Sequence, residues 1–324
     1  MPRILISDGI SVEAIRKLRE LEYEVIEKHY TQDELLSGVL NNYDAVIVRS
    51  ATKLNGEVLS TVEEGKGIRF IGRAGVGVDN INIEEATKKK IVVCNTPQSS
   101  TQSVVELTIG HLISSTRHIA KGDRKLRKNI WAKKELRGTE LSGKNLGLVG
   151  FGRIAQGVSK VASALGMNIH CYDPFIDEKI ANKNNCTIHN NVDNLFRNCT
   201  HISIHCNLNE NTYHLVNEER INIMPEFGFD GSKCGRHIVN CARGGIIDEE
   251  AAFIALSNGN LMSLALDVYE NEPLYDSKLI ELENFHGSPH IGASTIEAQN
   301  RIGQEIVILL EDFFSGKDPH SALN

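Results

Sequence analysis

Short, uninterrupted runs of apolar residues, separated by segments with helical periodicity, restrict this 324-residue chain to one class of fold. Continuous hydrophobicity, without alternation of apolar and polar positions, is typical of parallel strands covered on both faces. The pattern therefore predicts an α/β protein with parallel sheets. The runs are Ile4–Ile6, Ala45–Val48, Ile68–Ile71, Ile91–Val93, Leu146–Val149, Asn168–Tyr172, Ile202–Ile204, Ile238–Val239 and Leu264–Val268.

Three of the intervening segments carry the signal of a helix start. Thr31–Glu34 and Ser294–Glu297 match the capping box, in which a hydroxyl and a carboxylate satisfy the first free backbone N–H groups. Asp248 opens a third predicted helix, which ends before Gly259. Helices between strands are what a parallel sheet requires.

Length and charge exclude several classes of protein. A chain of 324 residues suggests two domains. With 35 basic and 42 acidic residues the net charge is −7, which argues against a nucleic-acid-binding protein. No apolar run approaches the roughly 18 residues of a membrane span, and the start of the chain does not resemble a signal peptide. We expect a soluble, cytoplasmic protein without membrane contact.

The seven cysteines form no C-x-x-C pair. Neither a zinc site nor a disulfide framework is favoured, because both require paired or closely spaced cysteines. We expect no bound metal, and we expect most of these thiols to be small core residues.

Gly150–Ala155 matches the pattern G-x-G-x-x-A. Of the three G-x-G triplets in the chain, only this one follows a predicted strand and opens a predicted helix, and Asp173 ends the next strand. In such a unit the glycines admit a pyrophosphate, the helix N-terminus faces its charge, and the carboxylate binds a ribose hydroxyl. An acid at Asp173 favours NAD over NADP. The alternative is a tight turn that binds nothing.

Polar residues follow other predicted strands, where ligands bind in open α/β sheets. Arg73–Gly77 could direct backbone N–H groups at an anion, and Arg49–Lys53 offers two cations and two hydroxyls. Both segments could instead be flexible or solvated turns. Arg243 lies between a strand and two glycines, and burying it is costly unless it faces an anion.

Three further candidates lie late in the chain. Asp267 falls inside a predicted strand and needs a partner there, either structural or a cofactor amide. Glu272 and His290 each adjoin a proline and could form an acid–base pair. Between Lys121 and Lys144 nine basic residues, three acidic ones and the single Trp131 could form a solvated helix face, an anion site or a subunit contact.

With these motifs in this order, the chain resembles the NAD-dependent D-2-hydroxyacid dehydrogenases over nearly its whole length. The resemblance rests on the segments 72–80, 138–141, 150–155, 239–245, 265–268, 272–273 and 289–295. Three stretches depart from the family pattern: Asn207 stands where proline is usual, 224–233 is longer than usual, and 284–288 makes a poor strand before His290.

The resemblance implies two Rossmann-like domains with doubly wound parallel sheets, the cofactor domain being inserted into the substrate domain. We expect a flavodoxin-like substrate domain at 1–98 plus 290–324 and an NAD-binding Rossmann domain at 99–289. The latter would include a dimerisation segment around 110–140, giving a homodimer or a larger homo-oligomer. We also expect the short form of the family, without its C-terminal regulatory domain.

The resemblance also assigns roles to residues of this chain. His290 would be the catalytic acid or base, Glu272 its partner, and Arg243 the clamp on the substrate carboxylate. Cofactor-binding positions would be Gly150, Gly152, Arg153, Ile154, Asp173, Cys206, Cys241, Ala242, Asp267, Gly292, Ala293 and Val76. Substrate-binding positions would be Arg49, Ser50, Lys53, Arg73, Gly75, Val76, Gly77, Lys133 and Lys134.

The activity implied is oxidation of 3-phospho-D-glycerate by NAD to 3-phosphooxypyruvate, the first step of phosphorylated serine biosynthesis. The cations named above favour a small anionic, phosphorylated hydroxy acid. One alternative is a reductase of glycerate, glyoxylate or hydroxypyruvate. Another is an NAD-sensing, corepressor-like interaction protein.

Overall fold

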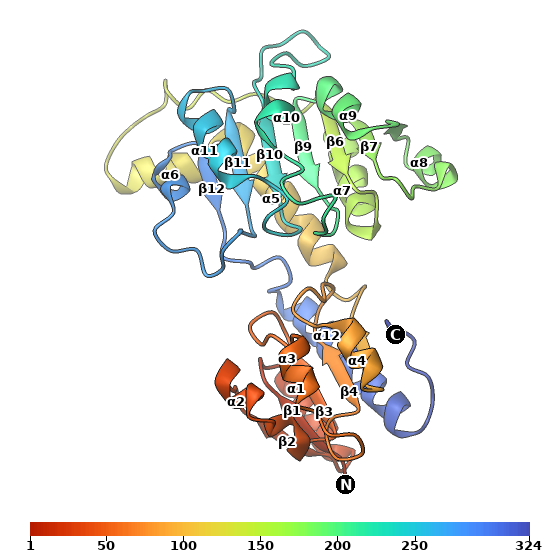
Figure 1. Cartoon of the computed structure of the whole chain (residues 1–324). Helices are drawn as coiled ribbons and strands as arrows, with labels where there is room; N and C mark the ends of the chain where they lie inside the picture. The colour runs from red at the N-terminus through yellow and green to blue at the C-terminus, as the bar shows by residue number, and fades with distance from the viewer. The chain divides into compact units, whose positions relative to one another are not determined.

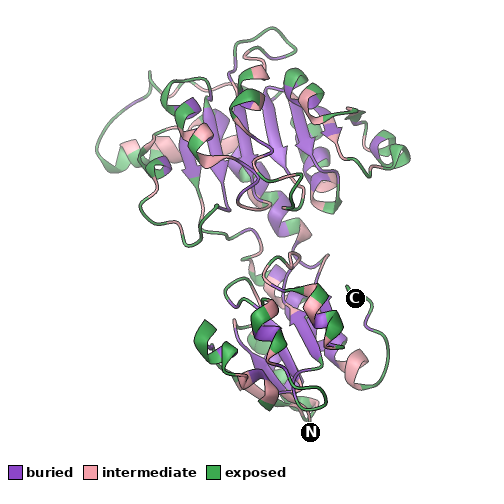
Figure 2. Cartoon of the chain, in the orientation of Figure 1, coloured by how far each residue is buried: buried purple, intermediate pink, exposed green.

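The computed structural model describes all 324 residues, which form two compact units. Unit 1 comprises Met1–Thr101 and Ala293–Asn324, and unit 2 comprises Gln102–Gly292. Unit 2 is therefore an insertion in unit 1. The boundaries fall shortly after the expected ones, so that His290 belongs to unit 2. In both units (Figure 1) the central strands are buried, and the outer faces of the helices are exposed (Figure 2).

Unit 1 has one parallel sheet in the order β2-β1-β3-β4-β5. Its strands are β1 Arg3–Ile6, β2 Glu24–Glu27, β3 Ala45–Val48, β4 Phe70–Arg73 and β5 Val92–Asn95. Helices α1 (Val12–Glu20) and α12 (Ile296–Phe314) cover one face. The other face is covered by α2 (Gln32–Leu36), η1 (Val39–Asn42), α3 (Gly56–Ser60) and α4 (Ile83–Lys88).

Unit 2 has a parallel sheet in the order β12-β11-β10-β9-β6-β7-β8. Its strands are β6 Asn145–Val149, β7 Asn168–Tyr172, β8 Thr187–Ile188, β9 His201–Ile204, β10 His237–Asn240, β11 Ser263–Leu266 and β12 Phe285–Gly287. Helices α5 (Thr101–Arg117), α7 (Arg153–Ala164) and α8 (Glu178–Lys183) cover one face. Helices α9 (Val192–Asn198), α10 (Glu218–Ile223) and α11 (Glu249–Ser257), with η2 (Lys278–Glu281), cover the other, and α6 is Ile119–Arg127.

The strand order reverses once in each sheet, between β1 and β3 in unit 1 and between β6 and β9 in unit 2. At such a reversal the loops leave towards opposite faces and open a crevice at the carboxyl ends of the strands. The loops after β3 and after β6, both singled out in the sequence, begin at these two places.

The predicted α/β class with parallel sheets is confirmed, and each predicted run overlaps a strand. Edge strands β2 and β8 were not predicted because they are partly exposed and lack a longer apolar run. The placement of Asp267 inside a strand is wrong, since β11 ends at Leu266. The second capping box is also wrong: Thr295, not Ser294, caps α12, whereas the box at Thr31 is present.

The long stretch 224–233 forms a surface turn that is held at two places. A β-bridge joins Phe227 to Lys233, and the buried Lys144 Nζ donates to an Asp230 carboxylate oxygen at 2.7 Å. Hydrogen bonds from Lys144 and Ser232 hold the pKa of Asp230 at about 2. The ion pair therefore fixes this turn to the amino end of β6.

Six of the seven cysteines are buried, as predicted, and Cys206 is half-buried. All seven are free thiols. No helix combines the length and the apolar composition that crossing a bilayer would require.

Candidate functional site

The Gly150 turn is shaped by the close approach of β6 to the end of β9. Gly150 has φ +86°, and a Cβ there would lie 2.9 Å from the backbone N of Cys206 and from the carbonyl group of His205. Only glycine fits this position without displacing backbone. By contrast, a Cβ at Gly152 would meet nothing within 4 Å, so the turn is open above the start of α7.

Helix α7 begins at Arg153, directly after the open turn, and Gly152 supplies no side-chain cap. Gly152 therefore brings no side-chain oxygen to the first N–H groups of the helix, whereas N-cap residues usually supply one. Asp173, at the end of β7, accepts from the N–H of Phe151 at 2.8 Å and from the N–H of Phe175 at 2.9 Å. Glycine turn, helix start and carboxylate thus lie together, and these residues fit the pyrophosphate and ribose of a dinucleotide.

The remaining predicted cofactor positions of unit 2 follow the carboxyl ends of neighbouring strands. Cys206 follows β9, whereas Cys241 and Ala242 follow β10. Burial raises the pKa of the Cys206 thiol to about 11 and that of Cys241 to about 12. Both thiols are therefore protonated at neutral pH and offer small, uncharged surfaces.

His290 and Glu272 form the predicted pair: His290 Nδ1 lies 2.7 Å from Glu272 Oε2. Glu272 Oε1 also accepts from the N–H of Tyr269 at 3.0 Å. Burial raises the pKa of Glu272, but the bonds from His290 and Tyr269 and the charge of Arg243 outweigh it and leave that pKa below its usual value. Glu272 is thus an anion that holds one imidazole nitrogen and leaves Nε2 for another partner.

Arg243 is held by the polar groups of its own turn. Asn240 at the end of β10 donates to the Arg243 carbonyl at 2.8 Å and accepts from the N–H of Ala242 at 2.9 Å. The Arg243 guanidinium donates to the Ala242 carbonyl at 2.6 Å. A Cβ at Gly244 would overlap the carbonyl oxygen of Tyr269, so this turn packs directly on the segment that carries Glu272.

Asp267 is 1% exposed and binds the loop that carries His290. Its carboxylate accepts from the Ser288 hydroxyl at 2.6 Å and from the N–H groups of Ile291 and Gly292 at 2.9 and 2.8 Å. The partner that a buried carboxylate needs is therefore this loop.

The predicted loop after β3 in unit 1 is organised by Asp8, which follows β1. The Asp8 carboxylate accepts from the N–H of Arg49 at 2.7 Å and from the N–H and hydroxyl of Thr52 at 3.0 and 2.6 Å. The Asn80 amide donates to the carbonyls of Arg49 and Thr52, both at 2.7 Å. With its backbone held in this way, the loop exposes the side chains of Ser50 and Lys53.

The loop after β4 folds around Gly75, which has φ +150°. A Cβ at Gly75 would overlap the guanidinium of Arg73, so the arginine side chain covers the space that a larger residue would take. Asn95 donates to the Val76 carbonyl at 2.7 Å and steadies the turn. Arg73, Gly75, Val76 and Gly77 belong to unit 1, as does Ala293.

Within unit 2 the structure separates the Lys133–Lys134 pair from the His290 pair. Both lysines are exposed in the segment after α6. Helix α6 is anchored at the amino end of the edge strand β12, because Lys121 and Lys125 pair with Glu283, which precedes that strand. His290 follows the carboxyl end of the same strand.

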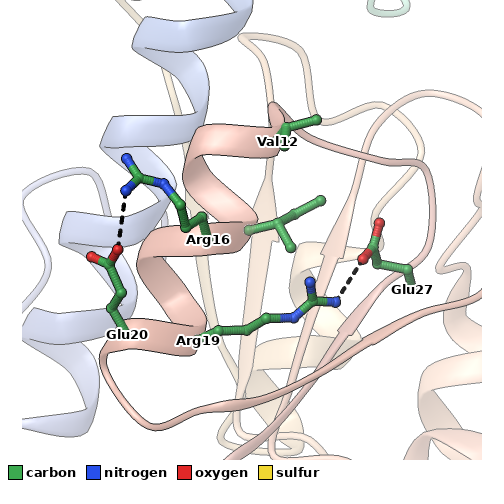
Figure 3. A pocket seen from close by; sticks show the side chains of 6 residues that line it. Val12, Arg16, Arg19, Glu20 and Glu27 are labelled. Carbon is green, nitrogen blue, oxygen red and sulfur yellow. Dashed lines mark hydrogen bonds and ion pairs between the residues drawn. The ribbon is translucent and has the colours of Figure 1, made fainter.

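Two other polar groupings are explained by internal ion pairs. His214 lies 2.9 Å from a Glu270 oxygen and 3.7 Å from an Asp248 oxygen, and the three could hold a cation. Both ring nitrogens of His214 already face these carboxylates, however, so the histidine itself joins the segments that carry Asp248 and Glu270. On unit 1 an open groove is lined by two Arg–Glu pairs, Arg16–Glu20 at 3.2 Å and Arg19–Glu27 at 2.9 Å (Figure 3).

The sequence interpretation missed Asp8, Ser288 and His111. Asp8 is a polar residue at the end of a strand, so the rule that identified Arg49 could also have identified it. Ser288 and His111 gave no local signal, because their partners are far away in the sequence.

Comparison with known proteins gives consistent matches. Residues 109–292 match the family described as "D-isomer specific 2-hydroxyacid dehydrogenase, NAD binding domain". The chain is 39% identical over 324 residues to a D-3-phosphoglycerate dehydrogenase of Methanocaldococcus jannaschii, and it spans only 60% of that relative's length. It is 42% identical over 309 residues to a hydroxypyruvate reductase of Thermotoga maritima, covering 94% of this chain and 96% of the relative.

A solved structure of a protein from Thermus thermophilus has the same fold. The TM-score is 0.88 at 28% identity, and the match covers 99% of this chain and 100% of the other.

Proposed function

The chain belongs to the D-isomer specific 2-hydroxyacid dehydrogenase family, and from this premise we propose that it oxidises 3-phospho-D-glycerate to 3-phosphooxypyruvate with NAD. In this proposal unit 2 is the NAD-binding domain and unit 1 the substrate-binding domain. The observation that carries the chemistry is the His290–Glu272 pair, with a 2.7 Å contact between Nδ1 and Oε2.

The pair suits the removal of a hydroxyl proton. Since Glu272 holds Nδ1, the free Nε2 of His290 takes the proton from the C2 hydroxyl as C2 becomes a carbonyl. Glu272 stabilises the imidazolium that forms. NAD, when bound, supplies the acceptor for the hydride that leaves C2.

Arg243 completes the proposed catalytic set. Its guanidinium can bind the substrate carboxylate through two parallel hydrogen bonds and stabilise charge on the C2 oxygen. Its turn packs on the segment carrying Glu272, and its charge lowers the pKa of Glu272, so the two groups lie near one another.

The preference for NAD over NADP is assigned to Asp173. A carboxylate beside the glycine turn accepts from a ribose hydroxyl and repels a 2′-phosphate. The hydrogen bonds from Phe151 and Phe175 hold this carboxylate in place.

The cations of unit 1 favour a phosphorylated substrate. Arg49, Lys53 and Arg73 provide more positive charge than a small hydroxy acid with one carboxylate requires. Lys133 and Lys134 are assigned to the substrate phosphate of a neighbouring subunit, because their own segment follows a helix anchored at the amino end of β12, whereas His290 follows its carboxyl end. Trp131 in that segment and Leu126 near the end of α6 are both exposed, and they are assigned to the contact of a homodimer.

The substrate is tested by following NADH formation with 3-phospho-D-glycerate and with D-glycerate at equal concentrations. We expect kcat/KM to be about 100-fold higher for the phosphorylated acid, since a site with several cations discriminates against a ligand that leaves them unpaired. A preference for D-glycerate would overturn the substrate assignment.

Hydroxypyruvate reduction is the second candidate, because the Thermotoga maritima relative matches this chain at nearly full length. The same assay run in reverse, with NADH and hydroxypyruvate against NADH and 3-phosphooxypyruvate, separates the two. Higher kcat/KM for hydroxypyruvate would favour the reductase.

A further inference from the structure

The half-buried Ser288 hydroxyl of unit 2 lies between a buried histidine and a buried aspartate. His111 Nε2 on α5 is 2.8 Å from Ser288 Oγ, and Ser288 Oγ donates to Asp267 Oδ1 at 2.6 Å. We propose that Ser288, oriented by His111, is a positioning residue that sets the catalytic imidazole of His290 through Asp267. This inference rests on the proposed role of His290 as the acid–base group.

The polarity of this chain of hydrogen bonds follows from its donors. A hydroxyl has one hydrogen, and Ser288 gives it to the Asp267 carboxylate, so Ser288 must accept from His111. His111 therefore carries its proton on Nε2. Burial lowers the pKa of His111, which keeps the ring neutral. The result is a single arrangement of donors, from His111 to Ser288 to Asp267.

Asp267 binds the loop on both sides of His290, through the Ser288 side chain before it and through the backbone after it. It binds Ser288 on one side and the N–H groups of Ile291 and Gly292 on the other. His290 itself has φ +51°, in the left-handed region that residues other than glycine rarely adopt. Such a conformation persists only where surrounding bonds maintain it, and these three bonds are well placed to do so.

Ser288 is also tied to the segment that carries Glu272. Its carbonyl accepts from the Tyr269 hydroxyl at 2.9 Å, while the Tyr269 N–H donates to Glu272 Oε1. Ser288 thus connects through Asp267 to the loop that carries His290, and through Tyr269 to the carboxylate of Glu272. Loss of the hydroxyl would keep the carbonyl bond to Tyr269 and both reacting side chains, but it would remove the bond to Asp267 and so alter the alignment of His290 with Glu272.

The test is Ser288→Ala, with Ser288→Thr as the variant that keeps the hydroxyl. We expect Ser288→Ala to lower kcat about tenfold or more, to leave KM for NAD and for the hydroxy acid within about twofold, and to shift the acid limb of the pH profile of kcat/KM. Ser288→Thr should restore kcat and the profile. His111→Leu, which leaves Ser288 intact, should show a smaller change in the same direction.

Ser263→Ala is the matched control. Ser263 is a buried serine that, like Ser288, is bonded to a histidine, His237 Nδ1 at 2.6 Å, but it lies at the opposite end of β11 from Asp267. We expect this variant to lose thermal stability while kcat and the pH profile stay unchanged. Equal losses of kcat in Ser263→Ala and Ser288→Ala at equal loss of stability would show a merely structural role and overturn the proposal.

His290→Gln separates the two levels of inference. If it abolishes turnover while Ser288→Ala keeps the wild-type kcat and pH profile, the acid–base role stands and the positioning role is wrong. If His290→Gln retains turnover, both fail. A readout independent of activity is the ¹⁵N chemical shift of the His290 ring, which we expect to move in Ser288→Ala and not in Ser263→Ala.

Discussion

At the scale of single residues, the arrangement around His290 is asymmetric. Nδ1 is occupied by Glu272, and no comparable carboxylate partner is found at Nε2. Nδ1 thus orients the ring, and Nε2 is left to accept a proton, which is the division of roles that a general base needs.

We expect His290→Gln to lower kcat by about 10²–10⁴-fold, because glutamine can hydrogen-bond to Glu272 but cannot accept a proton. Initial rates of NADH formation measure the effect. Thermal unfolding serves as the control for an intact fold, and wild-type turnover in a folded variant would refute the acid–base assignment.

Asp173 combines a structural and a selective role, and a single substitution can separate them. Asp173→Asn keeps an oxygen for the N–H of Phe151 and removes the charge. We expect the preference for NAD over NADP to fall at least about tenfold, since the repulsion of the 2′-phosphate is lost. The measurement is kcat/KM for both cofactors. An unchanged ratio would mean that charge at this position does not select the cofactor.

At the scale of secondary-structure elements, the two sheets use the reversal of strand order in different ways. In unit 2 the loop after β6 is open and rich in glycine. In unit 1 the loop after β3 is closed down on Asp8, whose side chain is only 4% exposed. The loop after β6 therefore leaves room for a ligand to contact the protein backbone, whereas the loop after β3 presents side chains from a fixed backbone.

We expect Asp8→Asn to raise KM for the hydroxy acid about tenfold and to leave KM for NAD unchanged, because it loosens the loop of Arg49–Lys53 in unit 1 only. Replacing one carboxylate oxygen by an amide leaves a buried donor unpaired and costs about 1–3 kcal/mol of stability.

The control for Asp8→Asn is Asp44→Asn, which removes a carboxylate bonded to the N–H of Arg3 at the amino end of β3. Steady-state kinetics and thermal unfolding of the two variants show whether the rise in KM comes from the loop or from lost stability. If both raise KM equally, the effect comes from lost stability and not from the loop.

At the scale of the whole molecule, the two units differ in their content of histidine. Of the twelve histidines only His29 and His320 belong to unit 1, and both are exposed. In unit 2, burial lowers the pKa of His237 and of His286 to about 4. We therefore expect the two units to respond differently to acid.

The sign of the effect follows from proton binding. A histidine in an unfolded chain titrates near pH 6.5. Between pH 6.5 and about 4, these histidines therefore bind more protons when unit 2 is unfolded than when it is folded. Each neutral, buried histidine therefore makes its full contribution to the free energy of unfolding above pH 6.5. That contribution is lost as the pH falls to about 4, by up to about 3 kcal/mol for each ring. Calorimetry at pH 7 and pH 5 should show unit 2 losing stability more than unit 1.

His286→Leu isolates one of these rings. Neither nitrogen of His286 has a hydrogen-bond partner, so the substitution removes a titrating group without breaking a bond. We expect the variant to depend less on pH between 7 and 5 than the wild type does. The same slope in both proteins would show that His286 does not contribute.

Short-range signals determined much of this protein. The Gly150 turn, the start of α7 and Asp173 lie within one strand–helix–strand unit, where periodicity and backbone freedom specify the arrangement. The capping box at Thr31 was predictable for the same reason. Edge strands β2 and β8 were not, since a short and partly exposed strand lacks the apolar run that identifies a central one.

The sequence by itself therefore determined the α/β class, the glycine turn and the identity of the candidate acid–base residues. Only the tertiary structure decided that Glu272 meets His290 at 2.7 Å, that Asp8 holds the loop of Arg49, and that Asp267 binds the loop on both sides of His290. Ser288 and His111 are 177 residues apart in the sequence. Hydrogen bonds between residues so far apart in the sequence depend on how strands and helices pack, and local propensity does not predict them.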